Sequence, residues 1–280
     1  MISRGISTLL LLASYLLPFP LFRRWLELGA KLLYIAPHIR KGMLENSRHI
    51  LGEASTHSQR KFLALAVLKN FGHAIAELLA AHREKENQNI EIKGKEHFFS
   101  AKTMNRGIIA VSLHMGSYEK GSMVIARQCK KAAIVYHRDP ASFFERLRSS
   151  QRRLKKLDEI AIDASPFFAI ELLNRLREGD AILMAGELAA DPRGQAFPFL
   201  DGEASFSSWP GRLAVTSGAP ILPAFTIRQP DQTLCLYLEE PLIAGADDSP
   251  ESIMEKLVAI FERYVRQYPE QWLMIRPFWK

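Results

Sequence analysis

The chain has 280 residues, of which 48% are hydrophobic and 24% charged, and its 37 Lys and Arg against 30 Asp and Glu give a net charge of +7. A chain of this length and apolar content can bury a substantial core as one or two domains, which excludes disordered and fibrous classes. The basic excess is compatible with an anionic membrane surface, an acidic protein partner or nucleic acid.

The N-terminal segment is apolar and interrupted by prolines. Residues 5–22 contain no charged side chain. Their length approaches the ~20 apolar residues that span a bilayer, but Pro18 and Pro20 are expected to break the helix. Residues 23–41 place leucine and tryptophan beside basic side chains. This pattern is typical of an interfacial anchor whose basic flank lies on anionic headgroups.

The first helices divide the chain into two predicted parts. We predict a membrane-associating helical segment at residues 1–35 and a single domain at residues 36–280, because no repeat, low-complexity tract or Gly/Ser-rich linker interrupts the latter. The alternative for the first part is a helix buried in the protein core. An anchor that spans the bilayer and one that lies in its interface both stay open.

Downstream of this segment the apolar pattern changes between helical and strand periods. Residues 58–84 show helical spacing, whereas Ile108 to Leu113 is an apolar run of strand length, as in a strand buried on both faces. A helix is predicted from Glu119 to Gln128, with Ser117 as its N-cap. Further strands are predicted at residues 132–136, 181–185, 221–227 and 233–238, further helices at 143–157, 167–178 and 249–268, and a long loop at 186–211.

This alternation of strands and helices predicts an α/β fold with a layered, mostly parallel sheet flanked by helices. In such folds the functional loops follow the carboxyl ends of the strands. His114 and Glu187 each stand at such a position. The sequence therefore directs attention to these two side chains.

His114 and Glu119 are the pair that best fits acid–base chemistry. On one continuous helix five residues would place them about 140° apart, but a strand–turn–helix at Gly116 lets them converge. A carboxylate bonded to one imidazole nitrogen fixes the tautomer and leaves the other nitrogen as a base for an acceptor hydroxyl. By spacing alone the pair is a weak signal, because most such pairs are structural.

A covalent nucleophile and a metal site are not expected. The chain has no Gly-x-Ser-x-Gly elbow, and Cys129 and Cys235 stand far apart without a CxxC pair or a Cys/His cluster. We therefore expect no metal and no cofactor. No covalent enzyme intermediate is required when the donor is a thioester, because its carbonyl is already activated.

Four blocks of the sequence resemble the bacterial lipid A biosynthesis (lauroyl/myristoyl) acyltransferases, a branch of the lysophospholipid acyltransferase group. The run GIIAVSLHMGSYEKGSMVIARQ is similar to the strand–His-x4-Asp/Glu–helix block of that family. Residues 179–228 contain its Pro-Phe, Arg-Leu-Ala and Gly-Ala-Pro landmarks, and residues 268–273 resemble its Pro-Glu-Gln-Trp signature. An early segment with Asn46, Asn70 and Glu77 also resembles the family, so nearly the whole chain is covered.

This resemblance implies transfer of a fatty acyl chain from acyl carrier protein, or less often acyl-CoA, to a hydroxyl of a lipid A precursor or related glycolipid. It implies His114 as the general base, Glu119 as the acid that orients it, and a hydrocarbon groove. It also implies a peripheral or singly anchored enzyme on the cytoplasmic face of the bacterial inner membrane. Nucleic acid is not an expected partner, because the aromatic residues are not interleaved with the basic ones.

Two positions depart from the family pattern. Gly186-Glu187 stands where many members have Asp-Gln, which makes Glu187 a candidate second carboxylate beside His114. Phe199-Leu200-Asp201 replaces a Phe-Phe-Gly. These departures leave the identity of the acceptor open more than the reaction type, so the acceptor could also be a lysophospholipid or another amphiphile. From a different class, a catalytically silent lipid-binding protein that retains the fold is a second alternative.

Arginines are the candidate substrate-binding residues. The position of Arg152 and Arg153 in the family pattern favours them as contacts to an anionic lipid acceptor, and Arg212 and Arg228 are further candidates. Arginine can hold a phosphate through two parallel hydrogen bonds. Arg152 and Arg153 belong to the basic helix predicted at 143–157. This helix could instead dock an acidic acyl carrier protein, or its charges could simply be solvated at the surface.

Overall fold

A seven-stranded sheet forms the centre of the computed structural model, which describes residues 4–83, 90–138, 143–154, 157–163, 167–187 and 195–279. The strand order is β1-β9-β8-β2-β5-β3-β4, and all neighbours are parallel except β8 and β9. The strands are β1 (Glu91–Lys93), β2 (Ile108–Ser112), β3 (Ala132–Tyr136), β4 (Asp158–Ala161), β5 (Ala181–Ala185), β8 (Ile221–Arg228) and β9 (Leu234–Leu238). The predicted α/β class with a mostly parallel sheet is confirmed.

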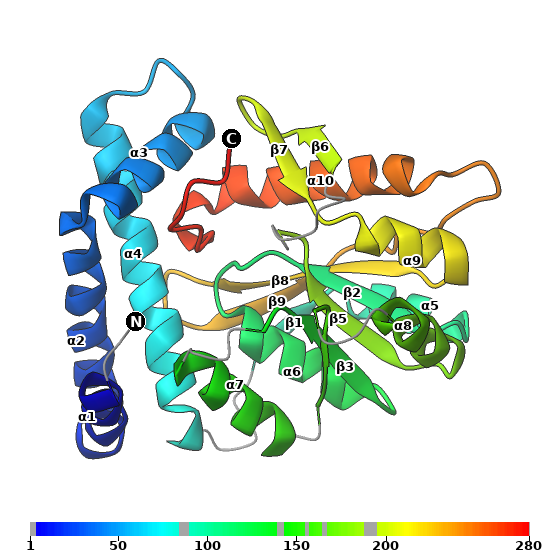
Figure 1. The fold of residues 1–280 in the computed structure, drawn as a ribbon, viewed down its shortest axis with the longest axis horizontal. Coiled ribbons are helices and arrows are strands. Elements are labelled where there is room, and N and C mark those ends of the chain that lie inside the picture. The colour runs from blue at the N-terminus through cyan, green and yellow to red at the C-terminus, as the bar shows by residue number, and fades with distance from the viewer. Residues whose placement is uncertain are drawn as a thin grey trace.

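Helices cover both faces of this sheet (Figure 1). Ile109 and Val111 of β2 pack with residues of α8, α9 and α10, whereas Ile108 and Ala110 pack with residues of α5 and α6. Burial on both faces explains why β2 reads as an apolar run and not as an alternating strand. The helices are α5 (Lys95–Thr103), α6 (Tyr118–Gln128), α7 (Phe143–Leu154), α8 (Phe168–Arg177), α9 (Trp209–Ser217) and α10 (Pro250–Gln267).

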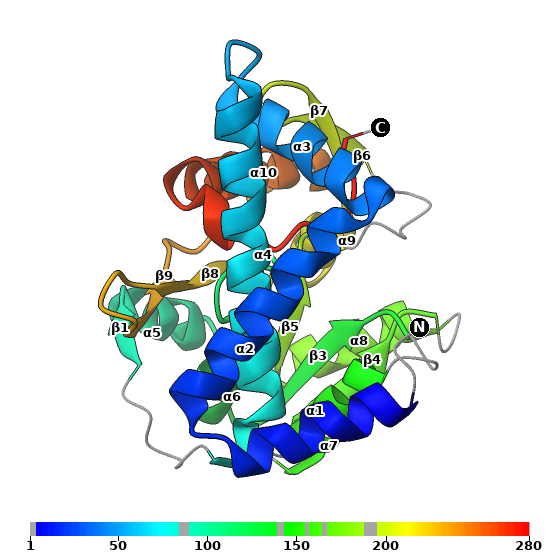
Figure 2. The same ribbon diagram turned by 90° about the vertical axis from the view of Figure 1, so that its left-hand side faces the viewer.

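Four helices at the start of the chain form a separate wall beside the sheet. Figure 2 shows α2 running along α4, with α1 at an angle to α2. The break between α1 and α2 falls at Pro18, as the prolines predict. Gly72 permits the close approach of α2 and α4, because a Cβ there would lie 2.7 Å from the Leu26 carbonyl oxygen. These helices are α1 (Arg4–Leu16), α2 (Phe19–Leu32), α3 (Pro37–Leu51) and α4 (His57–Leu79), with short 3₁₀ turns at Leu33–Ile35, Ala81–Arg83 and Pro269–Gln271.

Among the described helices, α4 has the length and apolar composition to cross a membrane. Most of its apolar stretch is buried inside the protein, as in the core helix of a soluble protein. The helices on either side of Pro18 have 13 and 14 residues, which is shorter than a bilayer span. The division into a helical segment at residues 1–35 and a domain at residues 36–280 stays a prediction. Helix α2 of the first part packs against α4 of the second.

Several short elements were not predicted. The expected loop at 186–211 contains an antiparallel hairpin, β6 (Gln195–Pro198) with β7 (Glu203–Phe206), and it ends inside α9. The edge strands β1 and β4 were also missed, because three or four residues are too few to establish a period. The helix predicted at 143–157 ends at Leu154, and residues 155 and 156 lie outside the described residues.

Candidate active site

The carboxyl ends of β2 and β5 bring His114 and Glu187 together. These strands are parallel neighbours, and their register pairs Ser112 with Ala185. Two residues beyond that pair, the Glu187 carboxylate lies 3.4 Å from Nδ1 of His114. The carboxylate in contact with the histidine therefore comes from the adjacent strand and not from the helix that follows the histidine.

The Glu187 carboxylate is buried and receives several hydrogen bonds. Its side chain is 1% exposed. The backbone N–H of His114 donates to both carboxylate oxygens, at 2.9 and 3.2 Å, and the indole N–H of Trp272 donates to Oε1 at 2.8 Å. An ionised carboxylate only accepts hydrogen bonds, so this set of donors suits the charged form.

The turn after His114 passes close to β8 and requires a glycine. Gly116 has a φ of +55°, and a Cβ on it would lie 2.1 Å from the Thr226 carbonyl oxygen. The same carbonyl accepts from the backbone N–H of Ser117 at 2.9 Å, and Gln271 accepts from that of Gly116 at 2.8 Å. The turn is thereby held against two other elements, which fixes where α6 begins.

Ser117 occupies the N-cap position of α6, as predicted, but does not cap it with its side chain. Its hydroxyl instead donates to the buried carboxylate of Glu77 on α4. Glu77 also pairs with Arg228 of β8, and Lys120 of α6 lies 3.7 Å from it. Through these contacts the Glu77 carboxylate connects α4 to α6 and β8 beside the turn.

The surroundings of His114 have opposing effects on its protonation. Burial among protein atoms lowers the pKa of the imidazole, but the Glu187 carboxylate outweighs this effect and holds the pKa above its ordinary value. The negative charge on Glu187 favours the tautomer with its proton on Nδ1. Nε2 is then the basic nitrogen, and 41% of the side chain is still exposed.

Glu119 has a different set of contacts. Its Oε1 lies 3.0 Å from Arg152 and 3.2 Å from Nε of Arg148, both on α7. No contact among the described residues joins it to His114. The orienting role predicted for Glu119 is therefore not supported by a direct contact, and the carboxylate that lies next to the imidazole is that of Glu187.

A cavity of about 700 Å³ has His114, Glu187 and Glu119 in its wall. It extends from the carboxyl end of β2 between α6 and the sheet, and residues of α4 form another side. The apolar part of the wall includes Ala110, Met123, Ile125, Ile134, Leu183 and Leu236. A base at one end of an apolar cavity can act on a polar group joined to a hydrocarbon chain.

The model of the bacterial lipid A biosynthesis acyltransferase family matches residues 3–280. This chain belongs to that family. The resemblance of the sequence blocks is thereby confirmed over the whole chain, and the protein is an acyltransferase of the lipid A type. A comparison with individual curated proteins found no match.

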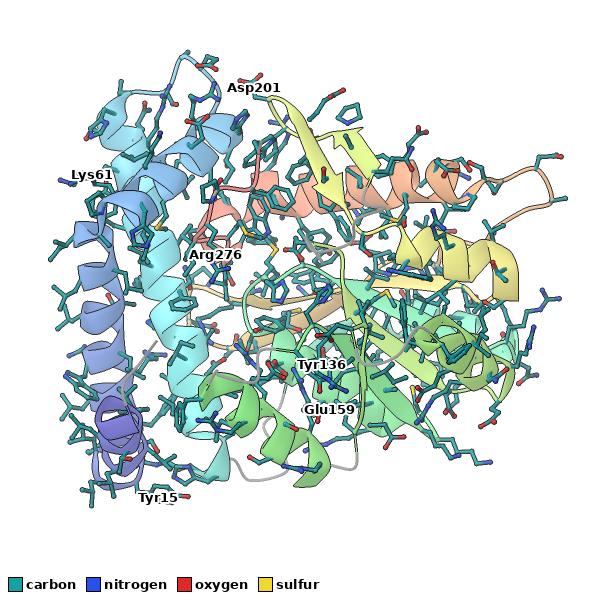
Figure 3. All side chains as sticks on the ribbon, in the orientation of Figure 1. Tyr15, Lys61, Tyr136, Glu159, Asp201 and Arg276 are labelled. Carbon is teal, nitrogen blue, oxygen red and sulfur yellow. The ribbon has the colours of Figure 1, made fainter. Side chains whose placement is uncertain are left out.

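In this acyltransferase Arg152 is buried among carboxylates and lines the cavity. Only 4% of it is exposed, and its guanidinium contacts Glu119 and Glu159 at 3.0 Å and Glu145 at 3.3 Å. It also lies over the ring of Tyr136, 5.6 Å from the centroid. These contacts join α7 to α6, β3 and β4, whereas Nε of Arg152 has no hydrogen-bond partner among the described residues. Figure 3 shows Tyr136 and Glu159 below the sheet centre.

The other candidate arginines of the acyltransferase lie in three different environments. Arg153 is exposed on α7. Arg212 of α9 donates to Ser208 at 3.1 Å and is not among the residues that line the cavity. Arg228 pairs with Glu77, and its side chain is 11% exposed. The structure therefore does not gather the four predicted arginines at one site.

The site of this acyltransferase also contains residues that sequence reasoning had not assigned. Trp272 lies in the Pro-Glu-Gln-Trp signature, but its hydrogen bond to Glu187 could not be read from the motif. Leu273 donates its backbone N–H to the His114 carbonyl at 2.8 Å, so the segment after α10 closes against the site. Within the described part of the chain, no group of three or more His, Cys, Asp or Glu could hold a metal ion.

Proposed function

We propose that this acyltransferase moves a fatty acyl chain from the thioester of acyl carrier protein, or of CoA, to a hydroxyl of a lipid A precursor or related glycolipid. The observation that carries the proposal is the position of His114. Its Nδ1 lies 3.4 Å from the buried Glu187 carboxylate, and its imidazole lines an apolar cavity. This arrangement supports a general base next to a space for a hydrocarbon chain.

The proposed reaction has two proton transfers and no covalent enzyme intermediate. Nε2 of His114 accepts the proton of the acceptor hydroxyl while the hydroxyl oxygen attacks the thioester carbonyl. Glu187 stabilises the imidazolium that forms, because its negative charge lies beside Nδ1. The tetrahedral intermediate then expels the thiolate, which takes the proton from the imidazolium. The products are an ester and a free thiol.

The apolar cavity supports a fatty acyl donor. Its volume of about 700 Å³ lies in the range of pockets that enclose small organic ligands. Apolar side chains of β2, β3, β5 and α6 form a large part of its wall, among them Ala110, Ile134, Leu183, Met123 and Ile125. In this proposal the hydrocarbon chain lies against these side chains, and the thioester and the hydroxyl meet at His114, which lines the same cavity.

The N-terminal helices support a peripheral location on the cytoplasmic face of the bacterial inner membrane. Leu21, Trp25, Leu28 and Leu32 recur on one side of α2, and each is at least 41% exposed. On α1 the exposed apolar residues are Leu9, Leu12, Tyr15 and Leu16. Exposed apolar rows of this kind, flanked by the exposed cations Arg24, Arg40 and Lys41, fit a helix lying in a membrane interface.

Acyl transfer by the purified protein tests this proposal. The protein is incubated with labelled acyl carrier protein thioester, or labelled acyl-CoA, and a bacterial lipid extract, and acylated lipids are identified. We expect an acylated glycolipid from the unchanged chain and none from His114→Ala. The control His57→Ala replaces an exposed histidine at the start of α4 and should leave activity unchanged.

The other outcomes distinguish the alternatives. An acylated phospholipid in place of a glycolipid would identify a lysophospholipid acyltransferase. Full activity of His114→Ala, with the circular dichroism spectrum unchanged, would exclude this histidine as the base. Lipid binding by the unchanged protein without any acylated product from either donor would favour the catalytically silent lipid-binding protein.

A further inference from the structure

The segment that follows α10 passes along the wall of the cavity and carries an arginine. Leu273, Met274, Ile275 and Arg276 all line the cavity that contains His114. Leu273 is bonded through its backbone to the His114 carbonyl. Figure 3 shows Arg276 beside α4, above the strands of the sheet. Arg276 is thus a cation in the wall of the proposed catalytic cavity, three residues from a direct backbone contact to His114.

The backbone at Arg276 is held in place by α3. Asn46 is 3% exposed, and its amide nitrogen donates to the carbonyls of Met274 at 3.0 Å and Arg276 at 2.7 Å. Its amide oxygen accepts from the N–H of Phe278 at 3.0 Å. Next to it, a Cβ on Gly42 would lie 2.6 Å from the ring of Pro277, so α3 and the segment are in close contact. The position of the Arg276 backbone is therefore fixed.

Arg276 differs in its partners from three other cations of the cavity wall. Lys120 lies 3.7 Å from Glu77, Arg148 lies 3.2 Å from Glu119, and Arg152 contacts three carboxylates. Arg276 is exposed, and within the described ranges no carboxylate lies at ion-pair distance from it. Its guanidinium donors are therefore open to a ligand that reaches the cavity.

We propose that Arg276 binds a phosphate group of one substrate of the acyl transfer and so positions that substrate beside His114. A guanidinium offers two parallel N–H donors that match two phosphate oxygens, and its positive charge strengthens both hydrogen bonds. The proposal rests on the proposed function, because it assigns the phosphate to the donor or to the acceptor. The two sources are the phosphodiester of the donor's phosphopantetheine arm and a phosphate on the acceptor glycolipid.

Equilibrium binding with one substrate at a time tests this role without any turnover. Two matched ligand pairs are compared by calorimetry on the full chain: pantetheine 4′-phosphate with pantetheine, and a phosphorylated glycolipid with its dephosphorylated form in detergent. Arg276→Gln should weaken binding of one phosphorylated ligand by about 10- to 100-fold, the size expected for a charged hydrogen-bonding pair. Binding of the phosphate-free partner should change less than about twofold.

The control removes one positive charge near the amino end of β5, whereas His114 lies at the carboxyl end of the neighbouring strand β2. Arg177 is exposed at the end of α8, just before β5 begins, and Arg177→Gln should leave all four affinities unchanged. Arg276→Lys keeps the charge but not the paired donors, and it should recover part of the lost affinity. Unchanged unfolding temperatures of the three variants would show that the exposed substitutions do not alter the fold.

Each outcome decides the proposal. Loss confined to pantetheine 4′-phosphate assigns the arginine to the donor, and loss confined to the phosphorylated glycolipid assigns it to the acceptor. Equal losses for ligands with and without phosphate, or no loss at all, would overturn the phosphate assignment. The unchanged protein could also show phosphate-selective binding that is lost in Arg276→Gln, yet transfer no acyl group. This result would refute the proposed function but support the phosphate site at Arg276.

Discussion

The Glu187 carboxylate lies 3.4 Å from the His114 imidazole, although 73 residues separate the two in the chain. The contact exists because β2 and β5 are adjacent parallel strands whose carboxyl ends are level. Glu119 is five residues from His114 but pairs with Arg148 and Arg152. The two carboxylates near the histidine therefore have separate surroundings, and their effects can be measured separately.

Replacing Glu187 by Gln should lower kcat by about 100-fold or more, because orientation and charge stabilisation of a general base are lost together. Glu187 raises the pKa of His114 against the opposing effect of burial. Its removal lowers that pKa, and the base is active when deprotonated. The acid limb of the plot of kcat/KM against pH should therefore move to lower pH, which steady-state assays across the pH range would measure.

Glu119→Gln is the comparison for this measurement. Glu119 also raises the pKa of His114, but its effect is the smaller one. The acid limb should move less than in Glu187→Gln, and the main effect should be on the contacts that join α6 to α7. A shift of the acid limb as large as that of Glu187→Gln would contradict the assignment of Glu187 as the orienting carboxylate.

Gly116→Ala should destabilise the protein by about 2–4 kcal/mol, since a left-handed φ and a backbone clash add together. The Cβ would lie 2.1 Å from the Thr226 carbonyl oxygen. Gly179→Ala provides the control, because its φ is also positive at +85° but no atom lies within 4 Å of its Cβ. Urea unfolding should give a loss of only about 1 kcal/mol there. Equal losses at both glycines would show that the clash is relieved at no cost.

Leu28→Glu should weaken binding to vesicles of anionic phospholipid, because a charge replaces an apolar side chain on the proposed membrane face of α2. Leu28 is 62% exposed, so the free energy of unfolding should change by less than about 0.5 kcal/mol. Ile243→Glu introduces the same charge at a residue that is 53% exposed and precedes α10. Co-sedimentation with vesicles should separate the two variants. Equal binding by both would contradict a membrane face on α2.

The stability of the fold should depend on pH through His73. Burial, with a contribution from Arg228, lowers its pKa from 6.5 to about 4, although Glu27 lies 3.4 Å away and acts in the opposite direction. Between these values the unfolded chain binds a proton that the folded chain does not. The free energy of unfolding should therefore fall as the pH decreases from 6.5 to 4.

The size of this effect follows from the shift in pKa, and is on the order of 3 kcal/mol. Urea unfolding of His73→Gln at several pH values should show a shallower dependence in this window than the unchanged protein. His57→Gln, at an exposed histidine, should leave the slope as it is. The same slope in His73→Gln and in the unchanged protein would show that other groups cause the acid sensitivity.

Local patterns in the sequence were sufficient for several features. The apolar run before His114 predicted a buried strand, because burial on both faces removes alternation. Pro18 predicted the break between α1 and α2, since proline cannot continue a helix interior. Strand-to-helix alternation predicted the sheet class. Each of these depends on residues within a few positions of one another.

The contacts of the site depended on packing across the whole chain. Glu187 lies next to His114 because β2 and β5 are neighbours in the sheet. Glu119 pairs with Arg148 and Arg152 because α7 packs beside α6. Neither arrangement can be read from the local sequence. The hydrogen bonds of Asn46 to the C-terminal segment link residues more than 200 positions apart. The sequence by itself thus determined which elements form and placed His114 at the end of a strand. Only the tertiary structure decided its acidic partner, because strand order and helix docking are set by burial of surfaces that lie far apart in the chain.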